Sequence, residues 1–259
     1  RIFKHSINDT LAYRFGVFVR VVGMSLTLSV MYFVFKAYYA GLGGQTPPVP
    51  FATMISYLAL AQFVGITHWN CVVIQTGEKV RSGKIAMELL RPWDWQTAQR
   101  TISAGGCVSN LLTSGLPLFI LYLALFRAGA AFTVFSAVAF TLSLCFAFMA
   151  RFYWNFMVAS LTFYIENTWG LAVASSYLIA IFSGMIIPLP LVPEPLRTVM
   201  ANSPFAAMIH TPVAIGSGLL DERGMVAALG IQLAWVVVLA LAGRLAFSRA
   251  SRVLTLHGG

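Results

Sequence analysis

The sequence predicts an all-α integral membrane protein with six transmembrane helices in a single domain, residues 1–259. Of its residues, 59% are hydrophobic and only 10% are charged, whereas soluble domains average about 45–50% apolar and 25% charged residues. Long apolar runs recur along the chain, and short clusters of Lys and Arg separate them. Since a span needs about 20 mostly apolar residues, six spans and their connections fit this length.

The first 16 residues have the period of an amphipathic helix. Phe3, Ile7, Leu11 and Phe15 recur every four residues, and polar side chains fill the other positions. We expect residues 1–16 to form a helix that lies in the membrane interface.

The first two spans are expected at residues 17–39 and 51–74, on either side of a Gly- and Pro-rich turn at 41–50. Residues 75–103 are the most charged stretch of the chain and predict a sizeable aqueous loop. The third span follows this loop and ends near Phe126.

The fourth span is expected at residues 131–150, which places Arg151 at a membrane boundary. The aromatic run at 152–164 either prolongs this helix out of the bilayer or lies flat in the interface. Glu166 and its neighbour Asn167 then predict a short polar break before a fifth span at 169–187.

A proline-rich outer element is expected at residues 188–224, before a last span at 225–247. Proline removes a backbone donor, so a straight helix in lipid would leave backbone groups unsatisfied here. We therefore expect a broken pair of half-helices that dips in from one side and is covered by protein. The interrupting residues within 196–220 are Arg197, Asn202, Pro204, His210 and Pro212.

The basic residues predict the orientation. Most of the 17 Lys and Arg residues fall on one side of the predicted spans, which is the cytoplasmic side by the positive-inside rule. Both termini and the 75–103 loop are therefore expected to be cytoplasmic, and Arg20, Arg151 and Arg244 to anchor inner boundaries. The basic residues on the opposite side are Lys36, Arg127, Arg197 and Arg223.

Motifs for chemistry within the chain are missing from the sequence. The stretch GEKVRSGK at 77–84 has one residue too many between its glycines for a phosphate-binding loop, and Ile85 replaces the required Ser or Thr. Neither HExxH nor GxSxG occurs. Cys71, Cys107 and Cys145 lack metal-ligand spacing, and the basic clusters do not form a nucleic-acid footprint. We expect no catalysis, cofactor or metal in this chain and no nucleic-acid partner.

The segment 81–95, RSGKIAMELLRPWDW, predicts a short amphipathic helix that Gly83 starts and Pro92 stops. An ordinary solvated loop is the alternative. Five apolar residues and two Trp, rimmed by charges of both signs, favour docking of a partner protein instead.

This segment, LTFYIENTWGL at 161–171, SGMIIPLPLVPEPL at 183–196 and NSPFAAMIHTPVAIGSG at 202–218 together resemble the ATP-binding-cassette (ABC) type 2 family of exporter permeases. The similarity covers nearly the whole chain. It is closest to a bacterial branch with a G-x5-L-L-R-P element between spans two and three. That element is matched here by Gly83, Leu89, Leu90, Arg91 and Pro92.

The resemblance implies an interfacial elbow helix, six spans, a cytoplasmic coupling helix and an extracellular re-entrant helical pair. It implies a permease of the bacterial plasma (inner) membrane that pairs with a second permease, identical or related. Two separate ABC ATPase subunits would bind ATP and Mg²⁺ and dock on the coupling helix. The residues implied in coupling are Arg81, Gly83, Lys84, Glu88, Leu89, Leu90, Arg91 and Pro92.

The expected function is export of a hydrophobic or amphipathic compound, such as a drug, antibiotic, peptide or lipid-like molecule. The rivals are a secondary transporter or channel and a membrane scaffold or enzyme subunit. Only Glu166 lies near a span end, so ion-coupled transport would lack its usual carboxylates.

The resemblance also places the substrate path mainly between spans two and five. Polar residues within those spans face either the path or a neighbouring helix, to which they donate hydrogen bonds. The candidates are Gln62, His68, Trp69 and Asn70 on span two, and Ser175, Ser176 and Tyr177 on span five.

Overall fold

The computed structural model describes residues 14–43, 46–126 and 133–257, and in these ranges it contains helices and turns but no strand. Five of its helical stretches are long and apolar enough to cross a membrane. A sixth apolar helix, α9 (Thr168–Phe182), is shorter. The five long stretches are Phe18–Gly41, Phe51–Arg81, Trp95–Tyr122, Val134–Phe163 and Glu222–Arg252.

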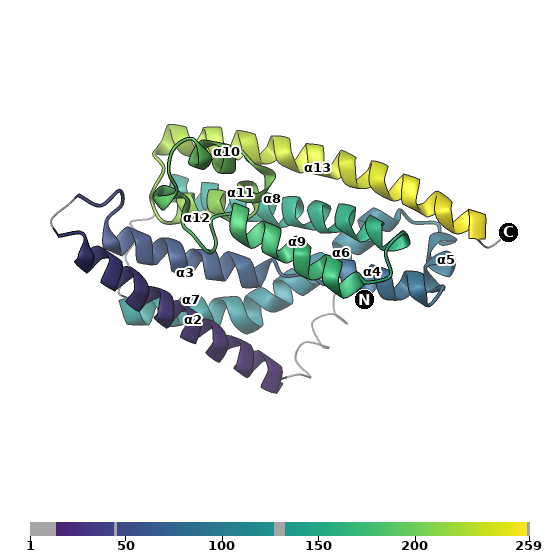
Figure 1. Cartoon of the computed structure of the whole chain (residues 1–259), viewed down its shortest axis with the longest axis horizontal. Coiled ribbons are helices and arrows are strands. Elements are labelled where there is room, and N and C mark those ends of the chain that lie inside the picture. The colour runs from purple at the N-terminus through teal and green to yellow at the C-terminus, as the bar shows by residue number, and fades with distance from the viewer. Residues whose placement is uncertain (1–13, 44–45, 127–132, 258–259) are drawn as a thin grey trace.

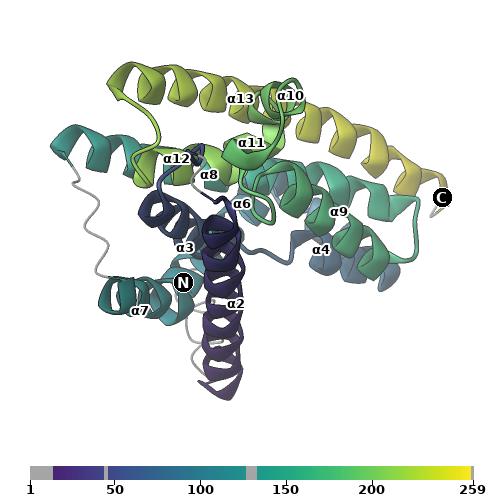
Figure 2. The same ribbon diagram turned by 60° about the vertical axis from the view of Figure 1, so that its left-hand side comes forward.

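The first span is α2 (Arg14–Gly41). Most of the interfacial helix predicted at 1–16 lies outside the described residues, and residues 14–16 belong to α2 itself. In Figure 2, α2 projects away from the rest of the bundle. Its side chains Phe18, Leu26 and Phe33 are more than half exposed, as expected of a helix that faces lipid.

The stretch 75–103 differs from the predicted aqueous loop because nearly all of it is helical. The helix α4 (Val72–Arg81) leads to a short helix, α5 (Lys84–Leu89), and then to α6 (Trp95–Asn110). The helix α6 continues through a π-helical turn, η1 (Leu111–Gly115), into α7 (Leu116–Phe126). The charges of this stretch lie mostly on solvated helix faces, while Ile85 and Trp95 are buried.

The aromatic run at 152–164 prolongs the fourth span. The helix α8 (Val134–Ala159) continues directly into a 3₁₀ turn, η2 (Ser160–Phe163), so the aromatic run does not form a separate segment. Phe152 and Phe156 are buried in the main hydrophobic core. Packing between α8 and the last helix, α13 (Glu222–His257), is the most extensive in the molecule, and Figure 1 shows the two running together.

The fifth span is shorter than predicted. The side chain of Asn167 accepts a hydrogen bond from the Gly170 N–H at 2.9 Å and caps the start of α9. The helix has 15 residues, about 22 Å in length, against a hydrocarbon thickness of about 30 Å. It ends before a turn at Gly184, whose φ of 80° favours glycine. A Cβ there would lie 2.3 Å from the Cδ1 atom of Leu189.

The proline-rich element forms three short helices rather than two: α10 (Leu196–Ala201), α11 (Pro204–Met208) and α12 (His210–Gly216). A 3₁₀ turn, η3 (Leu189–Leu191), precedes them. The side chain of Ser203 caps α11, and Pro204 occupies its first turn, where the missing N–H costs nothing. Most residues of α11 and α12 are buried against α3 (Phe51–Thr67), α8 and α13. In Figure 1 this element lies at one end of the bundle, while α5 and the C-terminus lie at the other.

Candidate functional site: a cavity between α2 and α9, and the exposed helix α5

The second span is broken within the bundle. The helix α3 ends at Thr67 and α4 begins at Val72, so residues 68–71 form no helix. Carbonyl groups near such a break need donors from elsewhere, because neither water nor the helix supplies them in a membrane. Arg151 Nη1 donates to the Gly65 carbonyl at 3.4 Å, and Asn110 Nδ2 donates to the Trp69 carbonyl at 3.0 Å. Side chains of α8 and α6 therefore stabilise the break.

A second set of hydrogen bonds joins the break to α9. Asn155 Nδ2 donates to Asn70 Oδ1 at 3.0 Å, and Ser175 Oγ donates to Asn155 Oδ1 at 3.3 Å. Trp154 Nε1 donates to Ser175 Oγ at 2.9 Å. These bonds fix α9 to α8 beside the break.

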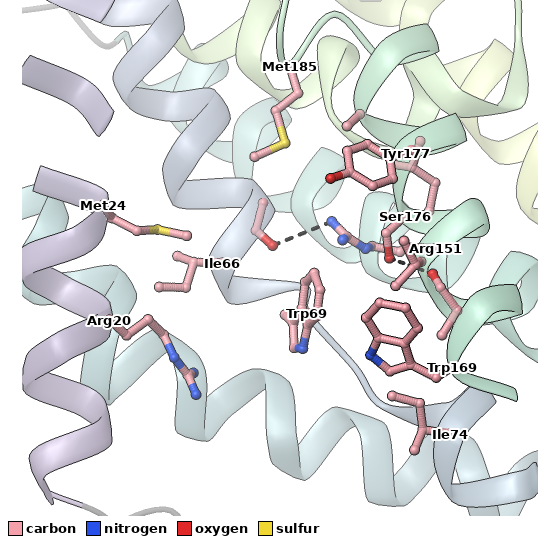
Figure 3. A pocket seen from close by; sticks show the side chains of 15 residues that line it. Arg20, Met24, Ile66, Trp69, Ile74, Arg151, Trp169, Ser176, Tyr177 and Met185 are labelled. Atoms are coloured by element: carbon pink, nitrogen blue, oxygen red, sulfur yellow. Dashed lines mark hydrogen bonds between the residues drawn. The ribbon is translucent and has the colours of Figure 1, made fainter. Parts of the chain in front are cut away.

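A cavity of about 760 Å³ lies beside this break. Figure 3 shows α2 on one side of it, with Arg20 and Met24, and α9 on the other, with Trp169. Gly65 and Arg151 line it from α3 and α8. The remaining lining residues are Ile66, Trp69, Ile74, Ala172, Val173, Ser176, Tyr177, Ile179, Ala180 and Met185.

Three of the seven predicted path residues line this cavity: Trp69, Ser176 and Tyr177. The other four are absent from its lining. Gln62, His68 and Ser175 are buried in the protein, and Asn70 is half-buried and bonded to Asn155. For Asn70 and Ser175 the alternative of helix-to-helix hydrogen bonding describes the structure.

Arg20 and Arg151 are the cavity residues that sequence reasoning placed elsewhere. Both were expected at a membrane boundary, but Arg151 is only 6% exposed and its guanidinium lies at the cavity. Arg20 donates through Nη1 to Asn110 Oδ1 at 3.1 Å. The sequence does not distinguish an arginine at a helix end from one that faces a cavity. The only signal for Arg151 was the apolar run on both sides of it, because a charged residue inside a span usually faces protein or water.

The second candidate site is α5. Gly83 precedes the helix with a φ of 69°, which a glycine adopts without strain. Ile85 is fully buried in the main core, and Lys79 Nζ contacts Glu88 Oε2 at 3.0 Å. Lys79 also lies 4.8 Å from the ring centroid of Trp95. These contacts hold α5 against the end of α4, and Lys79 also joins α4 to the start of α6.

The opposite side of α5 is apolar and uncovered. Leu90 is 86% exposed and Met87 is 66% exposed, while Leu89 is half-buried against the core. Arg91 lies 5.1 Å from the ring centroid of Trp93, which is itself about half exposed. Exposed apolar side chains with a charged rim are typical of a protein interface. The other predicted coupling residues, Arg81, Gly83, Lys84 and Pro92, are all exposed.

The turn after α5 is anchored by Asp94, whose carboxylate accepts hydrogen bonds from the N–H and hydroxyl of Thr97. Burial acts to raise the pKa of this carboxyl, but the Thr97 hydrogen bonds and the charges of Arg244 and Arg100 outweigh it. The net result is a pKa below the ordinary value for aspartate, so the cap is ionised at neutral pH.

Comparison with known proteins identifies the family. A family model described as ABC-2 family transporter protein matches residues 21–258, which is nearly the whole chain. No curated protein and no solved structure matches the chain significantly. The matched region includes the broken second span, α5, the outer helices and α13. The chain therefore belongs to the ABC-2 family of transporter membrane proteins.

Proposed function

We propose that this chain is the permease subunit of an ABC exporter, which expels a hydrophobic or amphipathic compound while separate subunits bind and hydrolyse ATP with Mg²⁺. The observation that carries the proposal is the uncovered apolar side of α5, where Leu90, directly after the helix, is 86% exposed while Ile85 fixes the helix to the core. A partner protein that covers Leu90 and Met87 would transmit its movements to α4 and α6, since these helices flank α5 directly.

The cavity between α2 and α9 supports an amphipathic substrate. Its lining combines aromatic and aliphatic side chains with two arginines, and its volume lies within the range of about 300–1,000 Å³ typical of small-molecule sites. Trp69, Trp169 and Tyr177 remain about half exposed or more at the cavity. This exposed rim is where we propose that the second permease, identical or related, faces the first across a shared path.

A secondary transporter or channel is the rival function. Ion-coupled transporters commonly carry intramembrane carboxylates, but the described residues that line this cavity include no Asp or Glu. Energy from a partner ATPase accounts for transport without such groups. A membrane scaffold is the third alternative, and it would need neither the cavity nor an uncovered α5.

We also propose that the protein resides in the bacterial inner membrane with both termini and α5 in the cytoplasm. In a background without cysteine, a single cysteine at Thr46 or Asp221 is expected to react with an impermeant maleimide added outside intact cells. A single cysteine at Ser82, an exposed residue just before α5, is expected to react only after the membrane is permeabilised. Reaction at Ser82 in intact cells would contradict this orientation.

The test of the proposed function is ATP hydrolysis. The isolated chain is expected to hydrolyse no ATP above background, because its sequence lacks a phosphate-binding loop. Co-expression with the ATPase encoded beside its gene is expected to give a complex whose hydrolysis rises when a transported compound is added. An ATPase variant without its phosphate-binding lysine is the control. Hydrolysis by the isolated chain, or failure of every neighbouring ATPase to co-purify, would contradict the proposal.

A further inference from the structure

We propose that the cavity between α2 and α9 binds the anionic head group of an amphiphile through the guanidinium groups of Arg151 and Arg20. Such a ligand carries a carboxylate or phosphate at one end and a hydrocarbon body at the other. Both arginines line the cavity, and they reach it from different helices, α8 and α2 (Figure 3).

The hydrogen-bonding capacity of Arg151 is underused. A guanidinium has five N–H donors, but the hydrogen bond to the Gly65 carbonyl is long, at 3.4 Å. The Nε atom is buried and has no hydrogen-bond partner. A side chain that is 94% buried and still has a free donor at a cavity needs an acceptor there.

The charges of the two arginines are not balanced by the cavity. Among the described residues that line it, none is acidic. The ion pairs of the described part of the chain are Lys79–Glu88, Arg197–Glu194 and Arg244–Asp94, and none involves Arg151 or Arg20. Arg151 is buried, and a buried charge without an ionic partner is costly in a low-dielectric site, whereas Arg20 is exposed. An anionic group at the Arg151 guanidinium removes that cost and accepts charge-assisted hydrogen bonds, and Arg20 adds a second positive charge to the lining of the same cavity.

The walls of the cavity select the rest of the ligand. Met24 and Ile66 line it near Arg20, and Trp69, Trp169 and Met185 add aromatic and thioether surface. Since these walls are apolar, a small hydrophilic anion would leave them unfilled. A hydrocarbon body attached to the anionic group fits both parts of the lining.

Two sources supply this chemistry: an anionic phospholipid that stays with the protein, and a transported solute with a carboxylate or phosphate. The second source rests on the proposed function. Binding of the anionic group does not, because it depends only on the cavity of this chain.

The binding test uses the purified full chain in an uncharged detergent and dibrominated stearate as the probe. Bromine quenches tryptophan fluorescence, and Trp69 and Trp169 both line the cavity. The methyl ester of the same fatty acid is the matched uncharged probe. We expect the carboxylate to bind about tenfold more tightly than the ester, as for a hydrogen bond to a charged group.

Variants locate the charge preference. Arg151→Gln is expected to remove most of it, Arg20→Gln to reduce it, and Arg151→Lys to keep it in part. Arg223→Gln, at an exposed residue at the start of α13, makes the same charge change away from the cavity and is expected to leave it intact. Thermal unfolding checks that each variant is folded; if Arg151→Gln unfolds, Arg20→Gln and Arg151→Lys carry the comparison. Equal binding of both probes by the parent, or a preference that these variants leave unchanged, would overturn the proposal.

Two further measurements separate the sources. An anionic phospholipid that native mass spectrometry finds on the parent but not on Arg151→Gln identifies a membrane lipid as the ligand. Stimulation of ATP hydrolysis by dibrominated stearate in the complex with its ATPase identifies a transported solute. Charge-selective binding without either result still supports the anionic site. The proposed transport function fails separately, if no ATPase co-purifies with the chain.

Discussion

Leu90→Asp is expected to reduce recovery of the ATPase subunit in a pull-down by about tenfold or more, because truncating a central interface anchor commonly costs about 1–2 kcal/mol or more. Leu90 is the most exposed of the large hydrophobic side chains in the described residues, at 86%. Placing a carboxylate there adds the cost of burying a charge when the partner docks. Insertion in the membrane is expected to be normal, since Leu90 makes little contact within the chain.

The control for Leu90→Asp is Ser248→Asp, which introduces the same charge at an exposed residue near the end of α13. Ser248 is 26 residues after the start of α13 at Glu222, or about 39 Å along the helix, beyond the roughly 30 Å of hydrocarbon. It is expected to leave recovery of the ATPase unchanged. Equal recovery with Leu90→Asp and with the parent would place the ATPase contact elsewhere, for example on the N-terminal segment.

Arg91→Glu tests communication at the same surface. Its guanidinium lies over Trp93 at the rim of the exposed apolar side, where charges set orientation more than affinity. Recovery of the ATPase is expected to fall less than with Leu90→Asp, while stimulation of ATP hydrolysis by a transported compound is blunted. Stimulation equal to that of the parent would exclude a role for this charge in coupling.

The sequence predicts the local features of α5 well because they depend on nearby residues. Gly83 adopts the left-handed conformation that starts the predicted short helix. The pattern groups Ile85 with Leu90 as apolar residues, however, whereas the structure buries Ile85 and exposes Leu90. The prolines at 188–195 likewise predict that the outer element is not one straight helix, and the structure has only short helices there.

The break at residues 68–71 could not be predicted in the same way. No proline or glycine lies within it, and the apolar character of the span continues up to His68. What stabilises the break are donors on other helices, Asn110 of α6 and Arg151 of α8, which are far away in the sequence. The residue pattern of the second span alone therefore does not predict these contacts.

The burial of Arg151 at the cavity could not be predicted from the sequence for a related reason. Counting residues from the start of the fourth span put it at a membrane boundary, but α8 continues for eight more residues, to Ala159. Continuation of the helix moves Arg151 into the protein, beside the end of α3. Only the packing of α4 against α8 and α9, together with the hydrogen bond from Arg151 to the Gly65 carbonyl of α3, makes this arginine a cavity residue.

Gln232→Leu is expected to destabilise the fold by about 2–3 kcal/mol, because it removes three hydrogen bonds that connect three helices. Gln232 on α13 is fully buried. Its Nε2 donates to the Ser143 carbonyl at 3.0 Å and to the Ala207 carbonyl at 2.8 Å, and its Oε1 accepts from Ser143 Oγ at 2.9 Å. Leucine keeps much of the side-chain volume, but it removes the partner of the Ser143 hydroxyl and of the Ser143 and Ala207 carbonyls.

The measurement is the midpoint of thermal unfolding of the purified chain in detergent, with Gln96→Leu as the matched control. Gln96 is also buried, but its one hydrogen bond, to the Ala240 carbonyl, is long at 3.4 Å, so its loss is expected to lower the midpoint much less. We expect the larger fall in midpoint for Gln232→Leu mainly because of the Ala207 carbonyl. This carbonyl lies near the end of the five-residue helix α11, where the helix itself supplies few donors, so it loses its partner when Gln232 is replaced. Gln232 therefore fixes the outer element to α8 and α13. Equal midpoints for the two variants would show that apolar packing alone holds α11 in place.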